Sequence, residues 1–466
     1  MSSKATVTTI NPATAEPIST YDTMTKEQVQ NVVSKARSAF VDWKGNLEKR
    51  KACLYSLTAY LRKNKIKLAE AATKEMGKVL KESISEVEKC AWALEYYADN
   101  GNNFLLDEVL NTDARKSFIT FEPLGVIGSI MPWNFPYWQA LRFAAPSLIA
   151  GNVIVMKPSS VTIQCGIEME NACREVGFPD GTFQTLIGRS DAAIHLIESD
   201  TNAITFTGST EVGAMVGQRS AALLKKCVLE LGGSDPFIVL EDANVEKAAS
   251  GAVKGRFINC GQSCIASKRF IVSKKVANQF IEKFVHNTSR MQVGDPMAIE
   301  SDIGPLVNKD AIENISSLVE DAKKKGAEIL LGGDRIGNKG YYYKPTIMTG
   351  ITPDMRIARE ETFGPVAPIT IFDDEKDAIR LANDSEFGLG GSIWTENLNK
   401  AEALSKKVES GIVTVNNVVI SDPRIPFGGI KHSGYGRELS KYGMLEFVNI
   451  KSVRFYDQLI HHHYVE

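Results

Sequence analysis

The residues of this sequence with the clearest chemical potential are a cysteine, a glutamate and an asparagine that lie far apart along the chain. Cys264 follows Gly261-Gln262-Ser263. Its glycine and polar neighbours predict an exposed turn, which suits a nucleophile. A free cysteine taken alone is more often an inert core residue. The nucleophile interpretation therefore depends on a general base and an oxyanion donor elsewhere in the chain.

Glu230 and Asn134 are the candidates for these two roles. Glu230 follows the apolar run 227–229 and precedes Leu231. A carboxylate at the mouth of an apolar strand is partly desolvated, which raises its pKa towards the range of a general base. Asn134 lies between prolines and aromatic residues in the segment 132–136, and an amide held this rigidly can donate to a developing oxyanion. A helix cap or salt bridge for Glu230, and a turn residue for Asn134, remain open alternatives.

A glycine-containing turn and a lysine indicate where an anionic ligand would bind. The turn 208–213 follows the apolar strand 203–206 and opens a helix, where free backbone N–H groups favour a phosphate. Gly208 would let the backbone approach that phosphate, although the turn departs from the G-x-G-x-x-G pattern and is weak evidence alone. Lys157 directly follows the strand 153–156, at the position where open α/β sheets bind ligands.

Length, charge and cysteine usage narrow the class of protein. A chain of 466 residues should divide into two or more lobes, and a net charge of −2 argues against nucleic acid as the main partner. Seven scattered cysteines predict reduced thiols in a cytoplasmic protein. No C-x-x-C pair occurs, so we expect no metal site, and the triplet His461, His462 and His463 reads as a solvated tail. Prolines and polar residues interrupt the most apolar region, 123–158, which argues against a membrane span.

Hydrophobic periodicity predicts an α/β fold. Residues 24–110 are mainly helical, with helical periodicity over 26–40 and 49–81, and are followed by strands at 116–122 and 126–130. Apolar runs then alternate with helical segments, which is typical of parallel sheets covered by helices. The expected strand and helix pairs are 153–156 with 162–176, 203–206 with 210–222, 237–239 with 245–260, and 269–272 with 276–289. Further strands are expected at 368–372 and 411–415.

The candidate residues belong to a set of motifs that resembles the aldehyde dehydrogenase superfamily. The motifs are PWNFP at 132–136, KPS at 157–159, FTGSTEVG at 206–213, ELGG at 230–233, GQSC at 261–264, ETFGP at 361–365 and PFGGIKHSGYGRE at 426–438. They follow the order of the family and extend over nearly the whole chain. The resemblance implies an NAD(P)-dependent enzyme with a Rossmann-type cofactor lobe, an α/β catalytic lobe and a small β oligomerisation extension.

The resemblance also implies a role for each matching residue. Cys264 would attack the aldehyde, and Glu230 would activate the thiol or the water that hydrolyses the resulting thioester. The side chain of Asn134 and the backbone N–H of Cys264 would stabilise the oxyanion. The matching cofactor residues are Trp133, Lys157, Gly208 and Ser209 around the adenosine diphosphate part, Glu361 and Phe363 against the nicotinamide ribose, and Leu231 near the nicotinamide.

Cofactor preference depends on Ser160. Members that prefer NAD often carry glutamate at this position, where it accepts a hydrogen bond from the ribose 2′-hydroxyl. A serine can instead donate to a 2′-phosphate, and Lys157 adds positive charge. We therefore expect NADP to be preferred, with NAD as the alternative cofactor.

The substrate interpretation depends on Arg142 and Ser421, which look closest to the succinate-semialdehyde dehydrogenase branch. There the matching residues hold the distal carboxylate of the substrate. Archaeal NADP-dependent glyceraldehyde dehydrogenases resemble the same branch, so the expected substrate is a small polar aldehyde, either succinate semialdehyde or D-glyceraldehyde. A structural salt bridge for Arg142 stays open. Cys260 is interpreted as a packing residue, with a resolving thiol as the alternative.

The resemblance further implies a division of the chain and an assembly. The cofactor-binding domain would comprise 1–111 and 125–231, the catalytic domain 232–447, and the oligomerisation extension 112–124 and 448–466. In relatives this extension pairs between subunits, so the resemblance implies a homodimer or a homotetramer, a dimer of dimers. An unpaired edge at 116–122 would otherwise invite aggregation. The rival functions are a CoA-acylating dehydrogenase, which usually lacks the glutamate that Glu230 matches, a phosphorylating enzyme, which would need a histidine beside the cysteine, and a catalytically idle binding protein.

Overall fold

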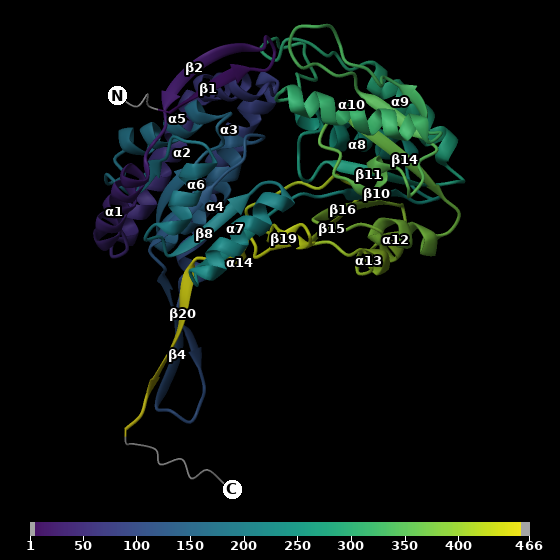
Figure 1. The fold of residues 1–466 in the computed structure, drawn as a ribbon. Helices are drawn as coiled ribbons and strands as arrows, with labels where there is room; N and C mark the ends of the chain where they lie inside the picture. Colours follow the sequence, from purple (N-terminus) through teal and green to yellow (C-terminus); the bar gives the residue numbers. More distant parts are fainter. Residues whose placement is uncertain (1–4, 458–466) are drawn as a thin grey trace.

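The computed structural model describes residues 5–457, which form two α/β lobes and a projecting antiparallel extension (Figure 1). The N-terminal lobe is built on a six-stranded sheet and the second lobe on a seven-stranded sheet. The chain leaves the first lobe after about residue 230 and returns to it near residue 434, because strand β19 (Gly434–Tyr435) pairs with β9 (Lys226–Glu230). The predicted α/β class is confirmed.

Three long helices open the N-terminal lobe. Helix α1 (Lys26–Trp43) begins with a capping box, in which Thr25 and Gln28 each accept a hydrogen bond from the other's backbone N–H. Helix α2 (Leu47–Met76) ends at Gly77, whose φ of 84° is left-handed. Helix α3 (Leu80–Asn100) follows at once. The prediction of one helical stretch over 49–81 was therefore wrong at its end, because a left-handed glycine terminates a helix.

The six-stranded sheet has the order β19-β9-β8-β5-β6-β7, in which all neighbours except β19 and β9 run parallel. Its other strands are β5 (Val126–Ile130), β6 (Val153–Lys157), β7 (Phe183–Thr185) and β8 (Ala203–Thr207). Its helices are α4 (Pro136–Ala150), α5 (Ile163–Glu175), α6 (Ser190–Glu198) and α7 (Thr210–Ala222). The chain winds from β5 outward through β6 and β7, then resumes on the other side at β8. The carboxyl ends of β5 and β8 therefore border a switch point, where such sheets bind ligands.

The seven-stranded sheet has the order β12-β13-β14-β11-β10-β16-β17, with only β12 antiparallel to its neighbour. Its strands are β10 (Asp235–Val239), β11 (Ser267–Ser273), β12 (Glu328–Leu331), β13 (Thr346–Thr349), β14 (Val366–Phe372), β16 (Gly390–Trp394) and β17 (Ile412–Val415). Its helices are α8 (Val245–Phe257), α9 (Ala277–Ser289), α10 (Lys309–Lys324), α11 (Arg356–Arg359), α12 (Glu375–Asn383) and α13 (Leu398–Ser405). Phe237, Phe270, Phe280 and Phe284 pack ring against ring in its core.

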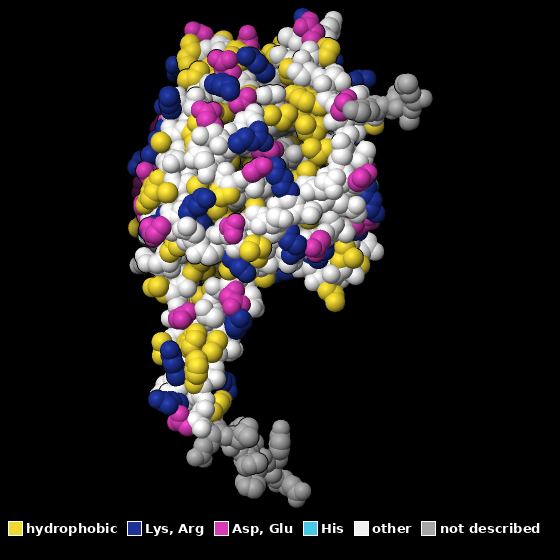
Figure 2. All heavy atoms as spheres, turned by 90° about the vertical axis from the view of Figure 1, so that its left-hand side faces the viewer, with side chains coloured by type: hydrophobic (Ala, Val, Ile, Leu, Met, Phe, Trp, Pro, Cys, Tyr) yellow, Lys and Arg dark blue, Asp and Glu magenta, His cyan; other side chains and the backbone are white. Residues whose placement is uncertain are grey.

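The extension is a three-stranded antiparallel sheet with the order β20-β4-β3. It joins β3 (Glu108–Leu110) and β4 (Lys116–Pro123) to β20 (Val448–Phe455), and it projects below the body of the molecule in Figure 1. Figure 2 shows hydrophobic side chains among charged ones on this projection. Val109, Ile450 and Phe455 are at least half exposed there.

The remaining elements are short or peripheral. They are β1 (Thr6–Asn11), β2 (Glu16–Asp22), the 3-10 helices at Gly101–Leu105 and Ile258–Gly261, β15 (Phe387–Gly388), β18 (Ile430–Lys431) and α14 (Ser440–Leu445). Over residues 5–457, no helix is both long and apolar enough to cross a membrane, and no His, Cys, Asp and Glu side chains cluster as a metal site would require. The histidine triplet at 461–463 lies outside the described residues.

Candidate active site

The predicted catalytic residues meet where the two sheets face each other. Glu230 ends β9 in the first sheet, and after four intervening residues β10 begins the second sheet. Cys264 lies just before β11, which begins at Ser267, and Glu361 precedes β14. The carboxyl edge of the six-stranded sheet therefore faces the amino edge of the seven-stranded sheet, and residues from both lobes can act on one ligand.

Cys264 ends a segment with unusual backbone geometry, residues 258–264, here called the nucleophile loop. The predicted helix over 245–260 was wrong at its end, because α8 stops at Phe257. Asn259, Cys260 and Gly261 then adopt positive φ angles of 50°, 55° and 73°. Left-handed geometry is costly for residues with a Cβ, so the surrounding structure must hold the loop in place.

Arg256 holds the nucleophile loop to the loop that carries Glu361 and Phe363. Its Nη2 donates to the carbonyl oxygens of Gly261, Thr362 and Gly364 at 2.9, 3.1 and 2.5 Å. Burial lowers the pKa of Arg256 to about 10, so the group stays charged at neutral pH. One buried cation thus fixes the distance between the nucleophile and a predicted cofactor-binding loop.

Asn134 is also fixed, and it lies against the nucleophile loop. The side-chain Nδ2 of Asn134 donates to the backbone carbonyl of Gln262 at 3.1 Å. The backbone carbonyl of Asn134 accepts a hydrogen bond from Asn259 Nδ2 at 2.9 Å. Lys78 donates to the same carbonyl at 3.3 Å and forms a buried ion pair with Glu86. The structure therefore brings Asn134 and the Cys264 loop together, as a shared oxyanion site requires.

The electrostatics of Cys264 favour the protonated thiol. Burial raises the pKa of Cys264 to about 11, although the charges of Arg142 and Lys268 oppose this rise. A base is therefore needed to produce the thiolate at neutral pH.

Glu230 has the properties of such a base. Its side chain is 2% exposed, and within residues 5–457 neither carboxylate oxygen has a hydrogen-bond partner. Burial, followed by the nearby charge of Glu438, raises the pKa of Glu230 well above its usual value. In the described part of the chain, no hydrogen bond joins Glu230 directly to Cys264.

The residues predicted to hold the cofactor gather at the carboxyl edge of the six-stranded sheet. Lys157 lies beside Ile130 in the register of β5 and β6, and Trp133 follows β5. The backbone N–H of Gly208 donates to the Glu230 backbone carbonyl at 3.0 Å. Ser160 is partly buried just beyond Lys157.

Two features of this edge bear on whether it could hold an anionic group. Ser209 caps α7 without a side-chain hydrogen bond, so the first N–H groups of that helix are available for an anion. Burial lowers the pKa of Lys157 to about 8, with Asp191 opposing.

The predicted nicotinamide residues lie on the side facing the second lobe. Glu361 accepts the backbone N–H of Gly233 at 3.1 Å, and the rings of Phe363 and Trp133 meet edge to face at 5.7 Å. Leu231 packs against Gly213 of α7, where any Cβ would come within 2.3 Å of the leucine.

A cavity beside the nucleophile contains both predicted substrate residues. Its lining comprises Cys264, Arg142 and Ser421, with aromatic side chains from Phe135, Trp138, Phe257 and Phe427. Arg142 forms a buried ion pair with Glu438, which is the salt bridge left open as an alternative, yet it still lines the cavity. Ser421 accepts a 2.7 Å hydrogen bond from Lys89. The sequence did not predict a role for Lys89. The only indication was its position among the apolar residues of α3.

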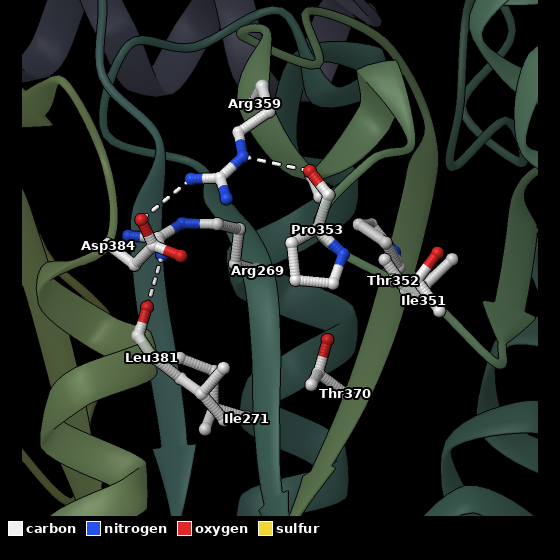
Figure 3. A pocket seen from close by; sticks show the side chains of 11 residues that line it. Arg269, Ile271, Ile351, Thr352, Pro353, Arg359, Thr370, Leu381 and Asp384 are labelled. Atoms are coloured by element: carbon white, nitrogen blue, oxygen red, sulfur yellow. Dashed lines mark hydrogen bonds and ion pairs between the residues drawn. The ribbon is translucent and has the colours of Figure 1, made fainter.

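A second pocket, lined by residues of β11, β14, α11 and α12 in the second lobe, lacks these features (Figure 3). Its guanidinium groups are already engaged: Arg269 donates to the carbonyls of Leu381 and Ala382, and Arg359 pairs with Asp384 at 2.7 Å. Neither cation is free to recognise an anion, so the cavity beside Cys264 is the candidate active site.

Comparison with known proteins places the chain among relatives of nearly equal length. A model described as the aldehyde dehydrogenase family matches residues 1–453. A probable NADP(+) succinate-semialdehyde dehydrogenase of Synechocystis sp. is 44% identical over 449 residues, covering 96% of this chain and 99% of that protein. The succinate semialdehyde dehydrogenase of Escherichia coli, named for NAD(P)+, is 41% identical and covers 95% and 96%. The solved structure of succinic semialdehyde dehydrogenase from Streptococcus pyogenes with NADP+ has a TM-score of 0.94 and 37% identity, covering 97% and 100%.

Proposed function

Because the chain belongs to the aldehyde dehydrogenase family, we propose that it oxidises succinate semialdehyde to succinate, with NADP+ as the preferred oxidant and NAD+ as a weaker one. The observation that carries the proposal is the cavity in which Cys264 shares one wall with Arg142, Ser421 and Lys89. Two cations and a hydroxyl suit a carboxylate at the far end of a short aldehyde. The names of the relatives above support the same substrate and cofactor.

The residues act in an order set by their chemistry. Glu230 removes the thiol proton of Cys264, and the thiolate sulfur forms a bond to the aldehyde carbon. The amide of Asn134 and the backbone N–H of Cys264 donate to the oxygen, which gains negative charge. When bound, NADP+ supplies the acceptor for the hydride that leaves this carbon. Glu230 releases the thiol proton to solvent, and the free carboxylate then deprotonates the water that attacks the thioester carbon. The bond from this carbon to the Cys264 sulfur breaks, the acid leaves, and the sulfur takes a proton back from Glu230, which restores the thiol.

The residues at the carboxyl edge of the six-stranded sheet and the loop with Glu361 would hold the cofactor. Lys157, Gly208, Ser209 and the start of α7 would hold the phosphates, and Ser160 would donate to a 2′-phosphate. Glu361 and Phe363 would position the nicotinamide ribose. Trp133 would lie against the adenosine diphosphate part, and Leu231 would lie near the nicotinamide. Arg256 keeps the loop that carries Glu361 and Phe363 at a fixed distance from Cys264, which limits the reorganisation that the reaction requires.

Initial rates provide the test. Succinate semialdehyde and D-glyceraldehyde are each offered with NADP+ and with NAD+, and reduced cofactor is followed by absorbance. A higher kcat/KM for succinate semialdehyde with NADP+ is expected. A higher value for D-glyceraldehyde would reassign the cavity to a polyhydroxy aldehyde and make Arg142 a structural residue.

The extension supports a homotetramer built as a dimer of dimers. Both outer strands of the β20-β4-β3 sheet have an open edge, and exposed Val109, Ile450 and Phe455 lie on it. We assign the β20-β4-β3 extension to assembly, the lobe of the six-stranded sheet to cofactor binding and the lobe of the seven-stranded sheet to catalysis. The pairings of β3 with β4 and of β19 with β9 move residues 108–110 to the extension and 434–435 to the first lobe, and residues 458–466 of the predicted extension lie outside the described residues. Sedimentation equilibrium should give four times the chain mass, and a monomer would contradict the assignment. The seven free cysteines suit a cytoplasmic enzyme.

A further inference from the structure

Lys89 occupies a position in the substrate cavity that no prediction had assigned. It projects from α3 into the cavity that Cys264 also lines. Its Nζ donates to Ser421 Oγ at 2.7 Å and lies 4.4 Å from the centroid of the Trp138 ring. The ammonium group is therefore held between a hydroxyl and an aromatic face, in a wall of the cavity that is otherwise largely apolar.

The charge of Lys89 has no acidic partner of its own in the described part of the chain. Glu86, one helical turn earlier, forms an ion pair with Lys78, and its other oxygen accepts the backbone N–H groups of Tyr137 and Trp138 at 2.9 and 2.8 Å. Asp422 accepts two hydrogen bonds from Arg424, at 2.9 and 2.6 Å. Both neighbouring carboxylates are thus committed to other partners.

Arg142 differs from Lys89 in this respect. Its guanidinium forms a buried ion pair with Glu438 and lies over the Phe427 ring at 4.3 Å. Its charge also acts on Cys264 and Glu230, whose pKa values it lowers. Arg142 therefore lines the cavity with its charge already balanced by Glu438.

The other lysines on the cavity wall are less suited to recognising an anion. Lys81 pairs with Asp302 at 2.7 Å, and Lys254 is exposed to water, which screens its charge. Lys89, in contrast, is partly buried, and a ligand anion would balance its charge.

We propose that Lys89, with Ser421 as its hydrogen-bonded partner, is the residue that selects aldehydes bearing a distal carboxylate over neutral aldehydes of the same length. The inference rests on the proposed function, because it names the group that reads the far end of the substrate. A carboxylate would accept from the ammonium and from the serine hydroxyl, and the ammonium would remain over Trp138.

The surroundings of Lys89 add a pH signature. Burial, and then the charge of Arg142, lowers the pKa of Lys89 to about 8, while Cys90, Asp422 and Glu86 oppose the shift. The ammonium is lost as pH rises through this value. In the wild type, kcat/KM for succinate semialdehyde should therefore fall above about pH 8 relative to kcat/KM for butanal, which carries a methyl group in place of the carboxylate.

The mutational test uses the same pair of substrates. Lys89→Met keeps the length of the side chain and removes its charge. We expect the ratio of kcat/KM for succinate semialdehyde over butanal to fall by about 10- to 100-fold, with the butanal value within about threefold of wild type. Lys89→Arg should retain most of the preference. Lys63→Met, at an exposed site on α2, is the matched control.

The outcomes separate this inference from the proposed function. Equal losses for both aldehydes, or an unchanged ratio, would overturn the role of Lys89 even if the wild type prefers succinate semialdehyde. A wild type that prefers butanal would instead overturn the proposed function. The wild-type pH profiles need no variant, so a Lys89→Met protein that fails to fold leaves the inference testable: parallel profiles for the two aldehydes would refute it.

Discussion

The ammonium of Lys268 donates a 2.7 Å hydrogen bond to the backbone carbonyl of Cys264. It also donates to the carbonyl of Ser263 at 2.8 Å and lies 3.3 Å from a carboxylate oxygen of Glu361. Lys268 is fully buried at the second residue of β11, so the sheet fixes its position. A single side chain thus connects the nucleophile loop with the residue predicted to hold the nicotinamide ribose.

Replacing Lys268 by Met should affect both ends of this connection. The charge of Lys268 lowers the pKa of Cys264, so its loss should move the alkylation of the thiol by iodoacetamide to higher pH. Released from its ion pair, Glu361 should hold the cofactor less well, and we expect kcat to fall by about 10- to 100-fold with a rise in KM for NADP+. Lys274→Met, at an exposed site just beyond the end of the same strand, is the control. An unchanged alkylation profile would restrict Lys268 to a packing role.

The two cysteines of the nucleophile loop should respond differently to substitution. Cys264→Ala should lower kcat by more than about 1,000-fold while NADP+ binding, measured by fluorescence, stays within a few fold. Cys260 is 3% exposed in the core of the second lobe, and burial raises its pKa, so it lacks the access and the thiolate that a resolving thiol needs. Cys260→Ala should keep most of the activity. Normal turnover in Cys264→Ala would refute its role as the nucleophile.

The sequence predicted the family and the central elements because both depend on local patterns. The match over residues 1–453 confirms the family, and the structure confirms the strands at 126–130, 153–156 and 203–206, which are short apolar runs buried on both faces. The helix ends at Gly77 and Phe257 were missed. Gly77 follows residues that are all compatible with a helix. The left-handed Asn259 is held by a distant group, because its backbone N–H donates to Glu82 of α3, and Arg256 holds the neighbouring Gly261 carbonyl.

The residues that support the site were harder to predict. Lys89, Arg256 and Lys268 belong to no motif with a known mechanism, and nothing in their neighbourhood distinguishes them from surface cations. Their positions follow from tertiary packing: Lys268 meets Glu361, 93 positions further along the chain, because β11 and β14 are neighbours in the sheet. The pairing of Arg142 in α4 with Glu438, between β19 and α14, likewise has no local signal.

The cofactor preference should depend on Ser160. In Ser160→Glu, the new carboxylate would repel a 2′-phosphate and accept from a 2′-hydroxyl, so the ratio of kcat/KM for NADP+ over NAD+ should fall by about tenfold or more. Ser38→Glu, exposed on α1, adds the same charge elsewhere and should leave the ratio unchanged. If Ser160→Glu also leaves the ratio unchanged, another residue recognises the 2′ position.

The pH at which kcat/KM falls on the acidic side should change when Glu438 is substituted, because Glu438 and Glu230 titrate as a pair. Glu230 works as a base only when ionised, so kcat/KM falls as pH drops through its raised pKa. The charge of Glu438 contributes to that raised pKa, whereas Arg142 lowers it. Glu438→Gln removes the negative charge that raises the pKa of Glu230 and leaves the positive charge of Arg142 without its ion-pair partner. Both changes lower the pKa of Glu230, so the acidic limb should move to lower pH. The measurement is kcat/KM with butanal across the acid range, with Glu402→Gln on exposed α13 as the control. A limb that stays in place or moves to higher pH would show that a group other than Glu230 controls the acidic side.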